Sequence, residues 1–173
     1  MTPLVNLIVR PAREEDAGMI ASFSAALALE TERRVLDEER LRQGTQSLLE
    51  SPRHGFFMVA ELADLGSPQL VGQLMITYEW SDWRNAAFWW IQSVYVAPAY
   101  RRRGVFRRMH DTVMATAKAD PKVCGVRLYV EKENRVAQIV YQRVGMAPSA
   151  YAVYEQDFVL ARLHQLEDRP NEA

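Results

Sequence analysis

The sequence has few of the residues that stabilise a fold by covalent or metal bonds. Among its 173 residues only Cys124 carries a thiol, so no internal disulfide can form. The histidines, His54, His110 and His164, are scattered without the spacing of a metal site. We therefore expect no metal, and we expect Cys124, which lies in the apolar stretch CGVRLYV, to be a core thiol rather than a nucleophile.

Long hydrophobic runs and an excess of either charge are also missing. No apolar stretch approaches the roughly 20 residues of a membrane span, and the start of the chain does not resemble a signal peptide. The formal net charge of −1 argues against a nucleic-acid partner. We predict a cytoplasmic protein without membrane or nucleic-acid partners, with one domain over residues 1–160 and a polar tail over 161–173.

Hydrophobic periodicity and turn residues predict the order β-α-α-β-β-β-α-β-α-β, an α/β domain with a mixed sheet. Strands are expected at 4–10, 55–62, 69–80, 88–96, 124–132 and 150–160, and helices at 13–29, 37–49, 105–119 and 134–145. In the last helix, an i, i+4, i+8 row is expected to pack in the core: Val136, Val140 and Val144.

Five arginines surround one glycine between a predicted strand and a predicted helix. They are Arg101, Arg102, Arg103, Arg107 and Arg108, with Gly104 among them. A strand–turn–helix arrangement directs backbone N–H groups and the positive end of the helix dipole toward one spot. Guanidinium groups add bidentate contacts to phosphate. A solvated basic face is the alternative, and the pattern favours a phosphorylated cofactor.

A second row, Asn134, Ala137 and Tyr141, lies at i, i+3 and i+7 on the last predicted helix. A buried amide and a buried phenol both need hydrogen-bond partners, and the small residue between them leaves room for a ligand. The alternative interpretation is that Tyr141 is an ordinary half-buried aromatic residue.

Together the two motifs resemble the GNAT superfamily of N-acetyltransferases, which use acetyl-CoA. The family's loop R/Q-x-x-G-x-G/A corresponds to Arg101, Gly104 and Phe106, and the pattern N-x-x-A-x-x-x-Y-x-x-x-G corresponds to Asn134, Ala137, Tyr141 and Gly145. The resemblance covers residues 4 to about 158. It implies a mixed, mostly antiparallel sheet of about six to seven strands flanked by four helices. Phe106 stands where the family has a small residue, so the sequence leaves the geometry of the helix start open.

The resemblance also implies a reaction, the direct attack of a primary amine of a small molecule on the thioester of acetyl-CoA. Tyr141 is implied to be the general acid for the leaving thiolate, and the pantetheine arm is expected to pair with the backbone of residues 94–96. The residues implied to hold the cofactor are Val94, Tyr95, Val96, Arg101, Arg102, Arg103, Gly104, Val105, Phe106, Arg107, Asn134, Ala137 and Tyr141.

The acceptor is less constrained by the sequence. Residues 78–96 look closest to the diamine and polyamine acetyltransferases, but Gln92 and Ser93 stand where those enzymes carry two acids. Strand alternation places one of Trp89 and Trp90 in the core. Residues expected near the acceptor are Glu30, Glu32, Trp80, Asp82, Trp83, Gln92 and Ser93.

Two other functions stay open on the sequence alone. One is acetylation of a protein or peptide amine, and the other is a non-catalytic acyl-CoA-binding module. The apolar and aromatic excess of the third, fourth and final predicted strands also predicts a homodimer.

Overall fold

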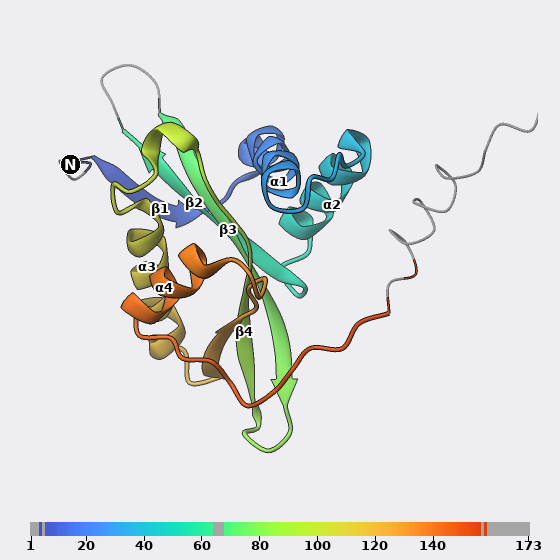
Figure 1. Ribbon diagram of the computed structural model, residues 1–173, viewed down its shortest axis with the longest axis vertical. Coiled ribbons are helices and arrows are strands. Elements are labelled where there is room, and N and C mark those ends of the chain that lie inside the picture. Colours follow the sequence, from blue (N-terminus) through green and yellow to red (C-terminus); the bar gives the residue numbers. More distant parts are fainter. Residues whose placement is uncertain (1–3, 5, 64–67, 157, 159–173) are drawn as a thin grey trace, which may run out of the picture.

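The computed structural model describes residues 4, 6–63, 68–156 and 158 (Figure 1). Its centre is a five-stranded sheet in the order β1-β2-β3-β4-β5. The strands are β1 (Leu7–Pro11), β2 (Gly55–Leu62), β3 (Gln69–Ser81), β4 (Ala86–Val96) and β5 (Val123–Leu128). Neighbouring strands from β1 to β4 run antiparallel, and β5 runs parallel to β4.

Helices cover both faces of this sheet. On one face lie α1 (Ala17–Glu32) and α2 (Glu38–Glu50), and on the other lies α3 (Val105–Ala119), with α4 (Arg135–Arg143) on the same side as α3 (Figure 1). Short 3-10 turns precede α1 (Glu14–Asp16) and follow β4 (Pro98–Tyr100). The four predicted helices are therefore confirmed.

The predicted number of strands needs correction. Residues 150–156 and 158 contain no strand, and the other residues of the predicted strand at 150–160, like the predicted tail at 161–173, lie outside the described residues. The described sheet thus has five strands instead of six to seven. Alternation in the sequence shows which faces a strand would present, but pairing also needs a sheet edge in register. Tyr151 and Val153 accordingly expose 79% and 69% of their surface.

The apolar core has two parts, one on each face of the sheet. On the α3 side, Met109 and Val113 pack against strand residues that include Leu74 and Trp89. On the other side, Ile20 of α1 and Leu48 of α2 pack against Phe57 and Val59 of β2. Trp89 is 7% exposed, which confirms that one of the two adjacent tryptophans is a core residue. Strands β2 and β3 therefore pack apolar side chains on both faces of the sheet.

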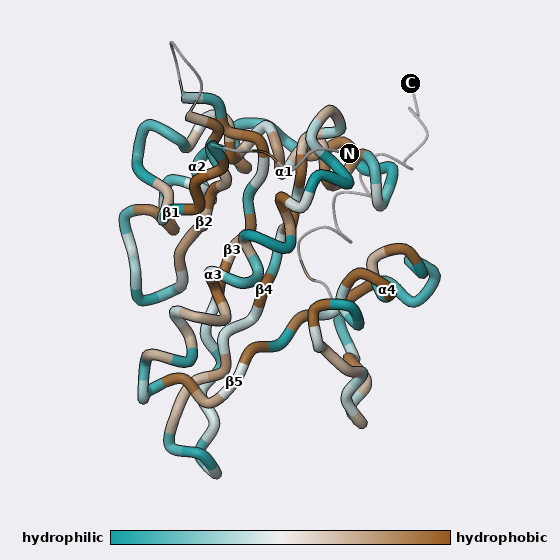
Figure 2. The backbone as a smooth tube through the Cα atoms, turned by 90° about the vertical axis from the view of Figure 1, so that its left-hand side faces the viewer, coloured by the Kyte–Doolittle hydropathy of each residue, from teal (hydrophilic) through white to brown (hydrophobic). Residues whose placement is uncertain are grey.

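The last helix is the exception, because α4 has no buried residue. Figure 2 shows α4 standing apart from the sheet. Val136 is 76% exposed, so the prediction that its row packs in the core is wrong. Helical periodicity identifies an apolar face, but it does not supply the surface that this face would cover.

An ion network fixes the start of α1 to the sheet. Arg10 of β1 donates to Asp16 (Nη1 to Oδ2, 2.7 Å) and to Glu61 of β2 (Nη2 to Oε2, 2.6 Å). The Asp16 side chain also accepts from the backbone N–H of Arg13 at 2.7 Å. All three charged side chains of the network are at most 14% exposed. Because charge-assisted hydrogen bonds strengthen away from water, this network sets the direction in which α1 leaves the sheet.

A buried histidine lies on α3. The His110 side chain is 3% exposed, and within the described residues neither ring nitrogen has a hydrogen-bond partner. Burial lowers the pKa of His110 below its usual 6.5, and the nearby Asp111 carboxylate only partly opposes this effect. The imidazole is therefore neutral in the folded protein at neutral pH.

This burial predicts a loss of stability in mild acid. Because the pKa of His110 is lower folded than unfolded, the unfolded chain binds the proton more readily, and the free energy of unfolding should fall as the pH drops below about 6.5. The slope from this one group is at most about 1.4 kcal/mol per pH unit. Denaturant unfolding of wild type and His110→Leu between pH 7.5 and 5 measures it. Parallel stability curves for the two proteins would contradict the prediction.

Candidate functional site

The central strand β4 bulges in its second half. Ser93 and Val94 of β4 together face a single residue of β3, Leu74. Ser93 has a φ of 49°, in the left-handed region that L-residues rarely adopt. A bulge bends its strand and turns backbone groups out of the ladder. The bulge at Ser93 therefore redirects main-chain N–H and C=O groups at the middle of the sheet.

Beyond the bulge, β4 and β5 part. The two strands pair from Ala87 to Ile91 of β4, and β5 ends at Leu128, whereas β4 continues to Val96. Within the described residues, the β5-side edge of β4 over 92–96 has no strand beside it. An extended ligand can pair with such an open edge as an added strand would.

The loop after β4 leads directly into the N-terminus of α3. Arg102 and Gly104 have φ values of 61° and 85°. The first i to i−4 bond of α3 runs from Arg108 N to Gly104 O at 3.0 Å, so the backbone N–H groups of residues 105–107 precede the helical ladder. The helix begins at Val105, which shows that Phe106 does not prevent the normal helix start. These N–H groups and the dipole of a 15-residue helix favour an anion here.

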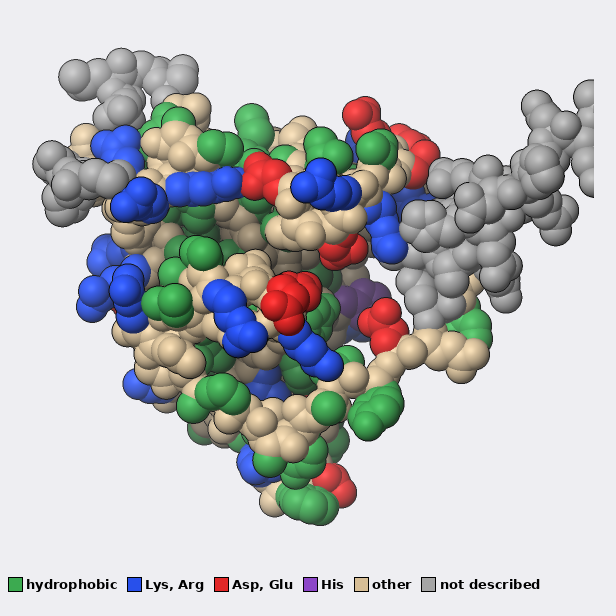
Figure 3. Space-filling model, in the orientation of Figure 1, with side chains coloured by type: hydrophobic (Ala, Val, Ile, Leu, Met, Phe, Trp, Pro, Cys, Tyr) green, Lys and Arg blue, Asp and Glu red, His purple; other side chains and the backbone are tan. Residues whose placement is uncertain are grey.

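A cavity of about 340 Å³ lies between this loop and α4. Residues of the loop and of the first turn of α3, including Arg102 and Arg107, form one wall. Residues of α4 and its C-terminus form the other: Val140, Arg143 and Val144. Figure 3 shows Lys and Arg side chains gathered over the same corner of the molecule, at the upper left. Arg143 was not singled out from the sequence, where an arginine in the last turn of a helix only complements the dipole.

Tyr141 contacts the first turn of α3 through an aromatic pair. Its ring meets Phe106 edge-on with ring centroids 5.6 Å apart, and Phe106 lies 5.9 Å from His110. Burial raises the pKa of Tyr141 above its usual 10, so its phenol is protonated at neutral pH. A protonated phenol beside the cavity can donate a proton, which is the role that the sequence predicted.

The other residues of the Tyr141 row have a local function in the structure. Asn134 is the N-cap of α4, and its Oδ1 accepts a hydrogen bond from the backbone N–H of Ala137 at 3.0 Å. This contact satisfies one of the first N–H groups of the helix. Asn134 and Ala137 therefore set the start of α4 and, through it, the position of Tyr141 one turn further along.

The predicted cofactor arginines differ in their contacts. The Arg101 guanidinium is engaged with Glu30 and with the Val96 carbonyl, each at 2.7 Å. Arg103 lies over the Tyr100 ring, 5.9 Å from its centroid. Arg101, Arg102 and Arg107 all line the cavity, and Arg107 Nε also lies 3.8 Å from Asp111 Oδ2.

The face of the sheet that carries α1 and α2 holds a polar and aromatic row beside the bulge. Gln92 donates to Thr77 Oγ1 at 2.5 Å and accepts from the Tyr129 hydroxyl at 3.0 Å. The Tyr129 ring lies 5.7 Å from Trp90, whose indole N–H donates to Glu79. Gln92 is thus held in one orientation next to Ser93, as part of a network that the sequence did not reveal.

Two carboxylates act on this network. The pKa of Tyr129 is raised by burial and by the negative charges of Glu155 and Glu32. Glu32 was expected near the acceptor, whereas Glu155 and Tyr129 were missed because nothing in their spacing relates them to Gln92. Glu32 is also paired with Arg34, at 3.9 Å between Nη1 and Oε2, whereas the two carboxylates together make the surroundings of Tyr129 negative, a charge that suits a cationic acceptor.

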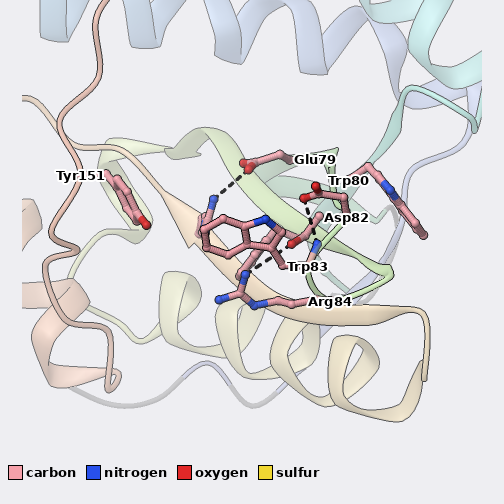
Figure 4. Close-up of a pocket in the computed structure, with 9 residues that line it drawn as sticks. Glu79, Trp80, Asp82, Trp83, Arg84 and Tyr151 are labelled. Atoms are coloured by element: carbon pink, nitrogen blue, oxygen red, sulfur yellow. Dashed lines mark hydrogen bonds and ion pairs between the residues drawn. The ribbon is translucent and has the colours of Figure 1, made fainter.

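A second cavity of about 330 Å³ lies at the β3–β4 hairpin, and its lining includes Trp80, Asp82, Trp83 and Tyr151 (Figure 4). Trp80 and Trp83 are 64% and 85% exposed. The hairpin precedes Ser93 by seven residues of β4, or roughly 20 Å along an extended strand. The structure thus brings Trp80, Asp82 and Trp83 together, but separates them from the expected acceptor residues at the bulge.

Arg127 closes the inner side of this second cavity. It donates to Glu79 at 2.8 Å, and its guanidinium lies 3.6 Å from the centroid of the Phe88 ring. Arg84 approaches the same ring at 5.0 Å. Glu79 is thereby paired within the protein, and its charge is compensated.

These features define a class of protein: a mixed sheet with a bulged central strand, an open strand edge and a basic loop at a helix N-terminus. The chain matches the Acetyltransferase (GNAT) family over residues 22–146, and it belongs to this family. The resemblance found in the sequence is confirmed at this level, and the protein is an acyltransferase of the GNAT type. In the described part of the chain, no helix is long and apolar enough to cross a membrane.

Solved structures agree with this assignment. A possible acetyltransferase from Clostridium difficile 630 is 41% identical, with a TM-score of 0.81 over 88% of this chain and 98% of that chain. A ribosomal-protein-alanine N-acetyltransferase from Brucella melitensis biovar Abortus 2308 is 16% identical, with a TM-score of 0.68 over 88% and 99% of the two chains. AAC(6')-Iy in complex with a CoA bisubstrate analogue is 13% identical, with a TM-score of 0.66 over 88% and 98%. The last two show the fold alone, and no curated protein matches the chain.

Proposed function

We propose that the protein transfers the acetyl group of acetyl-CoA to a primary amine of a small molecule by direct attack. The observation that carries the proposal is the parting of β4 and β5 at the Ser93 bulge, because it opens a strand edge that leads to the basic loop and the cavity. An assay of acetyl-CoA consumption over a panel of small amines, amino acids and peptides tests it. Turnover with peptides only would favour the alternative of a protein acceptor, and no turnover at all would favour a binding module.

The residues of the loop and of β4 fit this cofactor. The N–H groups of residues 105–107 and the side chains of Arg102, Arg107 and Arg143 surround the cavity where a pyrophosphate would lie. The open edge of β4 over residues 94–96 offers backbone groups to the amides of a pantetheine arm. Acetyl-CoA supplies an acetyl group activated as a thioester.

Tyr141 donates the proton that the departing thiolate needs. A phenol of ordinary pKa about 10 is a weaker acid than a thiol of pKa about 8.5, so the transfer costs about 2 kcal/mol, and burial adds to this cost. The cost is small beside the barrier of about 16 kcal/mol that corresponds to a turnover of about 10 per second. Proton donation from Tyr141 is therefore energetically acceptable at neutral pH.

The acceptor must lose a proton before it attacks. An amine of pKa about 10.4 is neutralised at pH 7 at a cost of about 4.6 kcal/mol. Glu32 and Glu155, whose charges both act on Tyr129, attract the protonated amine to the bulge. Gln92 and Ser93 are not bases, so a water held by Ser93 would carry the proton away. A diamine or polyamine is the acceptor type that this acidic region suits best.

The cofactor assignment predicts a charge effect at Gly104. Gly104→Asp places a carboxylate beside the proposed pyrophosphate position and should weaken CoA binding by at least about tenfold, as for a like-charge contact of roughly 1.4 kcal/mol. Gly104→Ala is the matched control, because both variants strain a backbone with φ of 85° and a Cβ there meets no atom within 4 Å. Calorimetry with CoA gives both affinities, and equal losses in the two variants would contradict the assignment.

The general-acid assignment predicts a large effect on turnover at Tyr141. Tyr141→Phe keeps the ring stacked on Phe106, so CoA affinity should change little, while kcat should fall about 10²- to 10⁴-fold. Steady-state kinetics with the true acceptor measure the loss. Asn134→Ala is the comparison, because it removes the cap of α4 while the phenol is retained, and it should act mainly by loosening cofactor binding. Wild-type kcat in Tyr141→Phe, with chemistry rate-limiting, would assign the acid to water or another residue.

We also propose a homodimer. The supporting observation is the exposed aromatic surface of the β3–β4 hairpin and of Tyr151 and Tyr154, which are 79% and 96% exposed. Sedimentation at tens of micromolar protein should give twice the chain mass of 19.8 kDa. A single species at the chain mass would contradict it.

A further inference from the structure

The Arg101 side chain borders the cavity and makes three contacts within the protein. Its Nη2 donates to Glu30 Oε2 at 2.7 Å, and its Nε donates to the backbone carbonyl of Val96 at 2.7 Å. Its guanidinium carbon also lies 5.3 Å from the centroid of the Tyr95 ring. Ion pair, backbone contact and ring contact together hold Arg101 back against β4.

Glu30 completes the contact from the other side. It lies in the last turn of α1, and its Oε1 accepts a hydrogen bond from the Tyr95 hydroxyl at 3.0 Å. Tyr95 is 6% exposed and stacks on Phe23 of α1, with ring centroids 5.2 Å apart. The Glu30 carboxylate therefore joins α1, β4 and the cofactor loop at one point, at the opposite end of α1 from the Arg10 network.

Stability alone does not account for this arrangement. The side chains of Arg101 and Glu30 are 42% and 41% exposed, and ion pairs with such exposure contribute little to the free energy of unfolding. The contacts instead determine geometry. They set the backbone from Val96 to Arg101, which leads into the left-handed residues Arg102 and Gly104.

We propose that Glu30 and Arg101 are positioning residues. The Arg101 side chain serves as a strut, meaning that it holds the loop in place from within the protein and is not a phosphate ligand. It thereby presets the loop whose backbone N–H groups receive the cofactor pyrophosphate. The inference rests on the proposed function, since it concerns the same cofactor. A preset loop loses less conformational entropy when the cofactor binds, so the strut favours binding without touching the phosphates.

The direction in which one substitution changes the affinity for CoA distinguishes a strut from a phosphate ligand. Glu30→Gln keeps the shape of the side chain and removes its charge. If Arg101 is a strut, the loop loosens and the Kd for CoA rises by about two- to fivefold, the range that an exposed ion pair can transmit. If Arg101 is a phosphate ligand held back by Glu30, the same change frees its charge and CoA binds more tightly.

The experiment is calorimetry with CoA on wild type, Glu30→Gln, Arg101→Lys, Arg101→Gln and the double variant Glu30→Gln/Arg101→Gln. Arg101→Lys keeps the charge but lacks the fork that reaches both Glu30 and the Val96 carbonyl, so its affinity should lie between wild type and Arg101→Gln. The double variant should bind no more weakly than the worse single variant, because both changes break one contact. Glu38→Gln, an exposed acid at the start of α2, controls for the lost charge.

Thermal unfolding of the same proteins provides the second readout. Weaker CoA binding in Glu30→Gln, with a Tm near that of wild type and unchanged affinity in Glu38→Gln, supports the strut. Unchanged or tighter binding in Glu30→Gln overturns it, and so does a large fall in Tm, which would make the pair merely structural. Wild-type protein that binds no CoA overturns both this inference and the proposed cofactor.

Discussion

The divergence of β4 from β5 at the Ser93 bulge is the constraint on which the rest of the site depends. Parallel neighbours share hydrogen bonds along their length, yet here the pairing stops at Ile91 while β4 runs on to Val96. Trp89 and Ile91 anchor the paired half in the α3-side core. The second half therefore projects with backbone groups that need partners, and both the basic loop and the acidic region around Tyr129 adjoin it.

Charge is distributed unequally around this opening. The basic side combines the N-terminus of α3 with Arg102, Arg107 and Arg143. The acidic side carries Glu32 and Glu155 around Tyr129. A net charge of −1 for the whole chain conceals this separation, which in the proposed function draws an anionic cofactor and a cationic amine to opposite sides of one strand. The Glu30–Arg101 ion pair lies at the boundary between the two regions.

Phe106, which stands where the family has a small residue, has a structural role in this arrangement. Its ring lies within 6 Å of both Tyr141 and His110, so three aromatic side chains join α4 to α3. The helix α4 buries no residue of its own, and this stack is its aromatic contact with the body of the protein. Burial in the stack also keeps the Tyr141 phenol protonated, as proton donation requires.

Sequence periodicity and turn residues predicted the order of the helices and of the first five strands, and two spaced motifs, which contain Gly104 and Tyr141, indicated the family. These features depend on neighbours a few residues apart, which set local backbone conformation. Only the tertiary structure decided that residues 150–156 form no strand, that Val136 is exposed, and that Glu155 acts on Tyr129. Arg101 and Glu30 are 71 residues apart. Local pattern cannot encode which distant side chains share a surface, so a predicted phosphate ligand became a residue bound to a carboxylate.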